Sequence, residues 1–219
     1  MHRMAFLERL GGKIGQKDSI SQLKLSELNR GLVGEWLENA KSLQGEFELG
    51  FWEGKYPESD IEAITDLRDV IQNSMPRDET ELEDDAFTVE QVREWQDVMV
   101  RRGIVVWTAY VRERNTGRFA GYTEVAWKPA HPEDLEQWDT GVVPAYRNRG
   151  IGRWLKAAMI DKVRRERPEV QQVRTGNSTT NASMLRINHE MGFKPYQSTY
   201  TWQIALDRVF DYLTSRRQG

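Results

Sequence analysis

The sequence predicts a mixed α/β fold in which antiparallel strands lie among helices. Two β-rich segments, 104–112 and 119–127, flank the turn residues Asn115-Thr116-Gly117, a pattern typical of a β-hairpin. Apolar residues recur at helical spacing both before and after this hairpin. This order of helices, antiparallel strands and then alternating strands and helices indicates helices packed against a sheet.

Helices are expected to dominate the part of the chain before the hairpin. Segment 25–43 is expected to form a helix and segment 47–52 a strand. A second helix is expected to begin near 56–60, where a proline and acidic residues stand in the first turn. Its apolar residues have helical spacing: Ile61, Ile64, Leu67, Val70 and Ile71. Thr88 and Gln91 predict the capped start of a third helix.

Strands and helices alternate after the hairpin. Segment 150–167 carries an apolar stripe at helical spacing, and Gly192 is placed to end a helix over 181–191. The remaining expected strands are 135–143, 170–175 and a last region over 193–206. These segments extend the predicted sheet beyond the hairpin.

Composition excludes several kinds of site. The 219 residues include no cysteine and three histidines, so disulfides, thiolate metal sites and a cysteine nucleophile are excluded, and we expect no bound metal. No apolar run approaches the roughly 18 residues of a membrane span, and residues 1–6 do not resemble a secretory signal, so we expect a cytoplasmic protein without a membrane partner. Basic residues gather between Ala145 and Arg174, which favours a small anionic ligand over nucleic acid.

A weak internal repeat links the two ends of the chain. Segment 10–13 (Leu-Gly-Gly-Lys) matches segment 191–194 (Met-Gly-Phe-Lys) at an offset of 181 residues. Further matches at this offset are Gln22 with Gln203, Leu23 with Ile204, Leu25 with Leu206, and Leu32 with Leu213. We therefore expect residues 1–44 to hold the tail of a preceding copy of the domain plus a helical linker, and residues 45–219 to form the main domain.

Segment 147–152 (Arg-Asn-Arg-Gly-Ile-Gly) lies between a predicted strand and a predicted helix. Free N–H groups at a helix N-terminus bind anions, and Gly150 and Gly152 let the backbone approach phosphate oxygens. Arg147, Arg149 and Arg153 add charged donors. The segment has neither the Gly-Lys-Ser/Thr of nucleoside-triphosphate loops nor the third glycine of dinucleotide loops. It predicts a phosphate site of another kind.

The wider segment 142–152 (Val-Val-Pro-Ala-Tyr-Arg-Asn-Arg-Gly-Ile-Gly) resembles the acetyl-CoA loop of the GNAT N-acetyltransferase superfamily. That loop reads Arg/Gln-x-x-Gly-x-Gly/Ala after a strand ending in Val-x-Pro. Asn181-x-x-Met184 and Gly192-Phe193 are similar to the family's following helix. The resemblance covers roughly residues 46–207 and is closest to the tandem group that includes mycothiol synthase. It implies a mostly antiparallel sheet with helices on both faces, a V-shaped splay between two strands, and acetyl-CoA as co-substrate.

The resemblance also implies which residues bind acetyl-CoA. Backbone groups from Arg149 to Arg153 are expected to hold the pyrophosphate, and Val142 and Val143 to hydrogen-bond the pantetheine arm as an added strand does. Asn181 and Asn177 are expected along the same arm, or alternatively in a helix cap and a turn. The full implied set is Val142, Val143, Arg147, Asn148, Arg149, Gly150, Ile151, Gly152, Arg153, Asn177 and Asn181.

Acetyl transfer to an amine needs a base that removes a proton from nitrogen, and a carboxylate usually serves. Three candidates lie in the two strands before the loop. Glu124 interrupts an apolar strand, Glu136 matches the family's base position, and Asp139 lies nearer the expected splay. The sequence leaves the choice among these three open.

The family often uses a tyrosine acid seven residues after the helix asparagine, but this chain has Asn188 there. An amide cannot act as a proton donor of that kind. Tyr196, Tyr200 or water could protonate the departing thiolate instead. The reaction could also proceed without an acid, because a thiolate is a tolerable leaving group. Asn188 is able to hydrogen-bond the sulfur or the pantetheine arm. The departure weakens the case for catalysis more than the case for acetyl-CoA binding.

The leading functional hypothesis is acetyl transfer to a small primary amine. The acidic segment 78–85 suits a cationic acceptor, because it falls in the loop that borders the site in the family. One alternative is acetylation of a protein N-terminus or lysine. Another is a catalytically weak, CoA-binding half of a tandem protein, and the repeat suggests an intramolecular or homodimeric contact between two GNAT domains.

Overall fold

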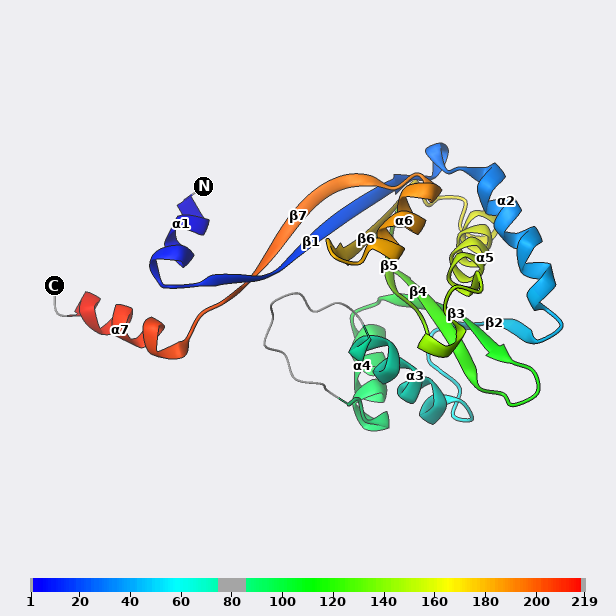
Figure 1. The fold of residues 1–219 in the computed structure, drawn as a ribbon, viewed down its shortest axis with the longest axis horizontal. Coiled ribbons are helices and arrows are strands. Elements are labelled where there is room, and N and C mark those ends of the chain that lie inside the picture. The colour runs from blue at the N-terminus through cyan, green and yellow to red at the C-terminus, as the bar shows by residue number, and fades with distance from the viewer. Residues whose placement is uncertain (1, 75–85, 218–219) are drawn as a thin grey trace.

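A computed structural model of the chain describes residues 2–74 and 86–217. Its centre is one sheet with the strand order β2-β3-β4-β5-β6-β1-β7 (Figure 1). Every neighbouring pair is antiparallel except β5 with β6. The strands are β1 (Lys13–Lys24), β2 (Phe47–Glu53), β3 (Val105–Glu113), β4 (Phe119–Trp127), β5 (Asp134–Val142), β6 (Gln172–Ser178) and β7 (Lys194–Gln203). The predicted mixed, mostly antiparallel sheet is confirmed.

Helices cover both faces of this sheet. On one face, α2 and α5 build the larger apolar core with β3, β4 and β5, and on the other face α3 and α4 close a smaller core. The α-helices are α1 (His2–Arg9), α2 (Arg30–Asn39), α3 (Ile61–Asn73), α4 (Val89–Arg101), α5 (Ile151–Glu166), α6 (Ala182–Met191) and α7 (Leu206–Arg217). Short 3-10 turns are η1 (Leu25–Glu27), η2 (Ala40–Leu43) and η3 (Pro144–Tyr146).

Local sequence signals account for several element ends. Thr88 accepts a hydrogen bond from the Gln91 N–H at 3.2 Å, and the Gln91 side chain accepts one from the Thr88 N–H at 2.8 Å, which completes a capping box on α4. Gly117 has φ 71° in the β3–β4 turn, and Gly192 has φ 105° where α6 ends. The predicted helix start, hairpin turn and helix end are therefore present.

Strands β5 and β6 separate after a short paired stretch. They pair over Asp134–Gln137 and Gln172–Thr175, although β5 continues to Val142 and β6 to Ser178. Beyond Gln137, the side of β5 that faces β6 carries no ladder hydrogen bonds. This is the V-shaped splay that the sequence predicts, and it opens beside the start of α5.

A β-bulge lies at the base of the splay. The register of the β4–β5 pair shifts so that Trp138 and Asp139 both lie opposite Glu124. Gly141 follows on β5, where a Cβ would come within 2.2 Å of Ile71 Cγ2 on α3. Only glycine allows α3 to pack this close, so the bulge and Gly141 together set the position of α3 over the splay.

The N-terminal segment differs from the sequence-based expectation. Residues 13–24, expected within a tail, form β1, which lies between β6 and β7 in the sheet. The expected helix over 25–43 is divided into η1, α2 and η2, because Asn29 caps a new helix by accepting from the Leu32 N–H at 3.2 Å. Segment 1–44 thus adds a strand and a helix to the sheet and core of the segment that follows. The domain boundary at residue 44 stays a prediction.

The two chain ends form an arm, defined here as the far part of the β1–β7 pair together with α1 and α7. Figure 1 shows this arm reaching away from the rest of the molecule, with both termini at its far end. The rings of Phe6 on α1 and Tyr212 on α7 meet edge to face, with centroids 5.6 Å apart. Neither α1 nor α7 was expected from the sequence.

Candidate active site

A cleft of about 470 Å³ lies where β5 ends and α5 begins. Residues from α3, β5, the loop before α5, α5 itself and α6 line it. Eight of the residues predicted to bind acetyl-CoA are in this lining: Val142, Arg147, Asn148, Gly150, Ile151, Gly152, Arg153 and Asn181. Val143, Arg149 and Asn177 lie outside it. Most of the predicted set therefore meets around one cleft.

The loop before α5 exposes the N-terminus of that helix to the cleft. Gly150 is the N-cap residue and has φ 88°, and Asn148 has φ 62°, so both are left-handed. The first N–H groups of a helix have no partner within it, and here they belong to Ile151 and the residues after it. Gly152 adds no side chain between these groups and the cleft. The geometry suits an anion such as a phosphate.

Two of the three predicted arginines are held by carboxylates. Arg149 donates 2.9 Å to Glu46 Oε1 and lies over the Phe47 ring, 4.8 Å from its centroid. Arg153 donates to the carboxylate of Glu190 at 3.0 Å. Each positive charge is already balanced, so these two side chains brace the loop in the structure described.

Arg147 has neutral partners instead. Its guanidinium donates to the Val142 carbonyl at 3.1 Å and to Ser74 Oγ at 2.6 Å. Arg186 on α6, which sequence reasoning did not select, also lines the cleft. Arg147 and Arg186 are thus the cationic side chains best placed to meet a phosphate in this cleft.

Backbone and amide groups line the splay beyond the loop. The Val143 N–H donates to the Ala120 carbonyl of β4 at 2.9 Å, so alternation along the strand directs the Val142 N–H toward the splay. Asn181 caps α6, with its side-chain oxygen accepting from the Met184 N–H at 3.3 Å. Its amide NH2 remains able to donate into the cleft.

Asn188 and Asn177 form one buried chain with a lysine. Asn188 Nδ2 donates to Asn177 Oδ1 at 2.7 Å, and Lys156 Nζ donates to Asn188 Oδ1 at 2.6 Å. Asn188 is 2% exposed. Burial lowers the pKa of Lys156 to about 7, because α5 carries this side chain into the core. Asn188 is thereby fixed from both sides.

Glu124 lies at the centre of a buried polar cluster. Its carboxylate accepts from Arg68 at 2.9 Å, from Thr108 Oγ1 at 3.0 Å, and from the Tyr56 hydroxyl. Glu124 is 0% exposed. Burial alone would lower the pKa of Arg68, but the negative charge of Glu124 and smaller effects of its neighbours outweigh it and raise that pKa. The Arg68 guanidinium is therefore held in its charged form.

Asp139 approaches the same arginine from β5. Its Oδ2 lies 3.7 Å from Arg68 Nη2 and accepts from the Tyr122 hydroxyl at 3.3 Å. Desolvation by its surroundings raises the pKa of Asp139, and the nearby charge of Glu124 raises it further, while Arg68 opposes both. The side chain of Asp139 is 38% exposed and that of Glu124 is 1% exposed. Asp139 is therefore the carboxylate of this pair that a ligand can reach.

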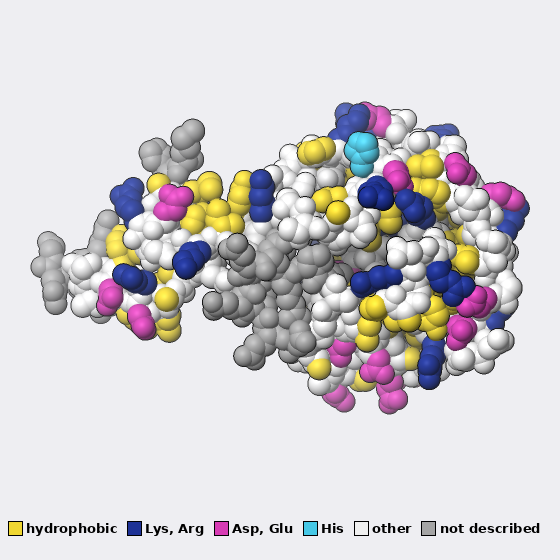
Figure 2. Space-filling model, viewed as in Figure 1, with side chains coloured by type: hydrophobic (Ala, Val, Ile, Leu, Met, Phe, Trp, Pro, Cys, Tyr) yellow, Lys and Arg dark blue, Asp and Glu magenta, His cyan; other side chains and the backbone are white. Residues whose placement is uncertain are grey.

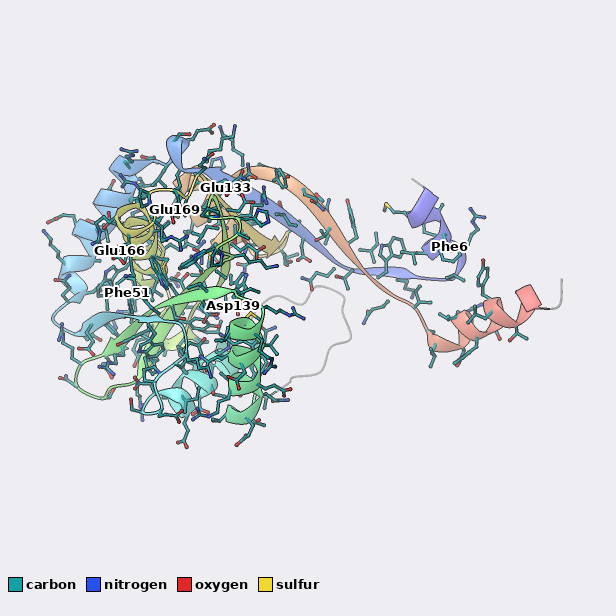
Figure 3. All side chains as sticks on the ribbon, turned by 180° about the vertical axis from the view of Figure 1, so that it is seen from behind. Phe6, Phe51, Glu133, Asp139, Glu166 and Glu169 are labelled. Atoms are coloured by element: carbon teal, nitrogen blue, oxygen red, sulfur yellow. The ribbon has the colours of Figure 1, made fainter. Side chains whose placement is uncertain are left out.

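Aromatic rings lie around Arg68, the shared partner of these two carboxylates. The Arg68 guanidinium lies 5.0 Å from the ring centroid of Trp95 on α4 and 5.6 Å from that of Tyr122. Trp95 and Trp138 have centroids 5.8 Å apart. Figure 3 labels Asp139 beside α4, the helix that carries Trp95. Aromatic faces around a carboxylate are a suitable environment for an ammonium group.

Glu136 lies apart from this cluster. Its carboxylate accepts from Trp138 Nε1 at 3.0 Å, and the residue is exposed. It lines a second hollow of about 220 Å³ with His131 and Arg174. The structure therefore brings Glu124 and Asp139 together and leaves Glu136 in another place.

The sequence model of the acetyltransferase (GNAT) family matches residues 66–193, more than half of the chain. The matched stretch holds the cleft loop, the splay and both grouped carboxylates. The chain belongs to the acetyltransferase (GNAT) family. This is a family of acyltransferases that use acetyl-CoA. A comparison with curated proteins finds no match.

Solved structures share the GNAT fold of this chain. A tandem GNAT protein from the clavulanic acid biosynthesis pathway has a TM-score of 0.71 at 23% identity, over 91% of this chain and 57% of that one. A GCN5-related N-acetyltransferase from Sphaerobacter thermophilus has a TM-score of 0.58 at 14% identity, over 91% of this chain and 54% of that one. The chain thus spans little more than half the length of these two proteins.

Sequence reasoning missed Tyr56, Arg68 and Lys156. A signal for Arg68 was present, because it follows Ile64 by four residues and so falls on the apolar stripe of α3. A charged residue on such a stripe indicates a buried partner. The same signal was present for Lys156, which precedes Met159 by three residues and Val163 by seven on α5.

Two further expectations concern ligands and surroundings. The acidic segment 78–85 lies outside the described residues. Among residues 2–74 and 86–217, no group of three or more acidic or histidine side chains is arranged to hold a metal ion. Within the same residues, no helix combines the length and apolar character that crossing a membrane requires.

Proposed function

We propose that this GNAT chain transfers an acetyl group from acetyl-CoA to the nitrogen of a small primary amine. The observation that carries this proposal is the position of Asp139. It is the partly exposed member of a buried carboxylate pair, and it lies on β5 three residues before Val142, which lines the cleft. A base at this point is close to the splay, where the thioester of a bound acetyl-CoA is expected.

The cleft supplies the groups that would bind acetyl-CoA. The N-terminus of α5 would receive the pyrophosphate, with Arg147 and Arg186 as flanking cations. The Val142 N–H and the amide of Asn181 would hydrogen-bond the pantetheine arm in the splay. In this arrangement Arg149 acts through its ion pair with Glu46 and supports the loop.

The reaction requires a proton acceptor and an aligned nucleophile. Asp139 takes a proton from the bound ammonium, and the freed nitrogen lone pair attacks the thioester carbonyl carbon. The C–N bond forms, the C–S bond breaks, and the sulfur leaves as thiolate. The second proton of the amine is lost as the amide forms, and the thiolate takes up a proton from solvent. Glu124 and Arg68 stay paired and hold Asp139 in position.

The surroundings of Asp139 favour a small acceptor. Helices α3 and α4 cover this face of the sheet. The rings of Trp95 and Tyr122 lie against Arg68, the ion-pair partner of Asp139, and Trp138 lies against Trp95. An ammonium group gains both charge pairing and contact with aromatic faces there. Acetylation of a protein N-terminus or lysine would need a more open approach.

One observation favours the alternative of a weakly active, CoA-binding half. Asn188 stands where the family often has a tyrosine acid, and its amide is occupied by Asn177 and Lys156. Its interactions are those of a structural residue. The alternative therefore predicts acetyl-CoA binding without transfer.

Calorimetric titration with acetyl-CoA, followed by thiol release across a panel of primary amines, tests the proposal. We expect binding and release for the unchanged chain. Arg147→Gln should weaken binding by about tenfold, since one charge-assisted hydrogen bond is lost. Asp139→Asn should keep the binding and lose the release. Absence of acetyl-CoA binding would refute the proposal, and binding without release on any amine would support the weakly active half.

A further inference from the structure

The internal repeat is visible in the backbone of the arm. Gly11 after α1 and Gly192 after α6 are both left-handed, with φ 76° and φ 105°. Each helix ends with the same pair of hydrogen bonds at the repeat offset. The Gly12 N–H donates to the Leu7 carbonyl at 2.9 Å, and the Phe193 N–H donates to the Asn188 carbonyl at 3.0 Å. The connections α1–β1 and α6–β7 are thus two copies of one motif.

The pairing of β1 with β7 has the symmetry of that repeat. Asp18 lies opposite Thr199, its own counterpart at the offset of 181 residues. Lys13 pairs with Gln203, and their counterparts Lys194 and Gln22 also pair. The register of the pair shifts by one residue at two places, at Gly15 on β1 and at its counterpart Tyr196 on β7. A local two-fold axis through the Asp18–Thr199 pair therefore exchanges β1 with β7 and α1 with α6.

At the same offset, α7 corresponds to residues 25–36, which form η1 and the first part of α2, yet the surroundings of the two segments differ. On the β1 side, β6 pairs with the strand along Asp18–Lys24, and α2 packs against α5. On the β7 side, the strand is at the edge of the sheet. Leu25 of the first copy is 9% exposed, whereas its counterpart Leu206 is 66% exposed.

On the β7 side, helix α7 carries an exposed apolar face. Leu206, Phe210 and Leu213 follow at helical spacing on one face of the helix and are 66%, 57% and 51% exposed. We call these three residues the α7 face. Figure 2 shows apolar side chains on the arm, and Figure 3 shows it well apart from Asp139. Exposed clusters of large apolar side chains indicate a binding surface.

We propose that a second GNAT-type body, related to this one by the axis through Asp18 and Thr199, docks on the outer edge of β7 and on the α7 face. Its counterpart of β6 would pair with Thr199–Gln203, as β6 pairs with Asp18–Gln22. Its counterpart of α5 would cover the α7 face, as α5 packs against α2. The two sheets then join through the central β1–β7 pair.

A second copy of this chain does not fit that place. In such a copy, β1 already occupies the edge of β6 that β7 would need. The partner is instead a second GNAT body of the same polypeptide, one that leaves this edge open. The likeness to a tandem GNAT protein of which this chain spans 57% supports that choice.

Single cysteines test the docking, because the chain contains none. The reporter Leu213→Cys lies on the α7 face. Leu32→Cys is its counterpart on packed α2, and Asp211→Cys is an exposed control on another side of α7. The three variants are made in the protein at its natural length, with any flanking residues its gene encodes. Labelling rates with a thiol reagent are measured beside native mass spectrometry.

We expect Leu213→Cys to label at least about tenfold more slowly than Asp211→Cys, and about as slowly as Leu32→Cys. Native mass should show one polypeptide large enough to hold a second GNAT body, and a complex with a different GNAT chain would overturn the proposal. Fast labelling of Leu213→Cys, with Leu32→Cys protected, would overturn the proposal. Slow labelling in a homodimer of this chain alone would also overturn it, because the occupant would then be a second copy.

Discussion

Arg68 Nη1 lies 2.9 Å from Glu124 Oε2, and the two side chains keep 13% and 1% of their exposure. Removing one partner of a buried ion pair costs about 3–5 kcal/mol where the remaining charge has no other partner, and here Asp139, 3.7 Å from Arg68, offsets part of that cost. Glu124→Gln should therefore lower the free energy of unfolding by up to about 3–5 kcal/mol in urea denaturation. Glu58→Gln, which breaks the exposed pair with Arg93, is the control and should have a far smaller effect. Equal effects would contradict the structural role of Glu124.

The raised pKa of Asp139 gives a second prediction. Its carboxyl becomes protonated at a higher pH than usual, so kcat/KM should fall on acidification through that pKa. Asp139→Asn should remove this acidic limb and lower kcat by about 10²-fold or more. Because the folded pKa is raised, the stability that the protonated carboxyl contributes is lost as pH rises, so the variant should unfold no more easily than the parent at pH 7. An unchanged acidic limb would exclude Asp139 as the base.

Lys156 should make stability depend on alkaline pH. Its pKa is lowered to about 7 in the folded chain, from 10.5. Between these values the unfolded chain binds a proton that the folded chain does not, so the free energy of unfolding should rise with pH by up to about 1.4 kcal/mol per unit. Lys156→Met should flatten this slope in denaturation series from pH 7 to pH 10. Lys41→Met, at an exposed lysine, should leave it unchanged.

Gly141 should tolerate no side chain. A Cβ at this position meets Ile71 Cγ2 at 2.2 Å, so Gly141→Ala should displace α3 and destabilise the fold by about 1–3 kcal/mol. Both residues line the cleft, so acetyl-CoA binding should weaken too. Gly176→Ala on β6 is the matched control, since nothing lies within 4 Å of its Cβ. Ile71→Ala in the same chain should restore part of the loss, and no rescue would contradict the contact.

Local patterns in the sequence predicted most of the sheet and the loop. The β3–β4 hairpin, the Thr88 cap and the 147–152 loop each depend on neighbouring residues, so a single segment specifies them. Strand β1 has a mostly polar sequence and depends on β6 and β7, which lie far along the chain. No local pattern could reveal it.

The site was predictable only in part for the same reason. The loop glycines and arginines carry their own signal, and the cleft lining includes most of them. The choice between Glu124, Glu136 and Asp139 depends on Arg68, which comes from α3 and meets the strands only after folding. The three carboxylates differ in burial and therefore in their chemical environment, and burial is determined only when the chain has folded.

The place of β1 in the sheet also affects synthesis. The ribosome makes β1 long before the residues that pair with it, since Asp18 pairs with Ser178 and Thr199. At ~5–20 residues per second, the nascent strand waits roughly ten seconds or more before either partner emerges. Lys13, Lys17, Asp18 and Lys24 keep it charged during that time, which discourages pairing with other nascent chains. Closure of the sheet on both sides of β1 thereby comes only after β6 and β7 have been made.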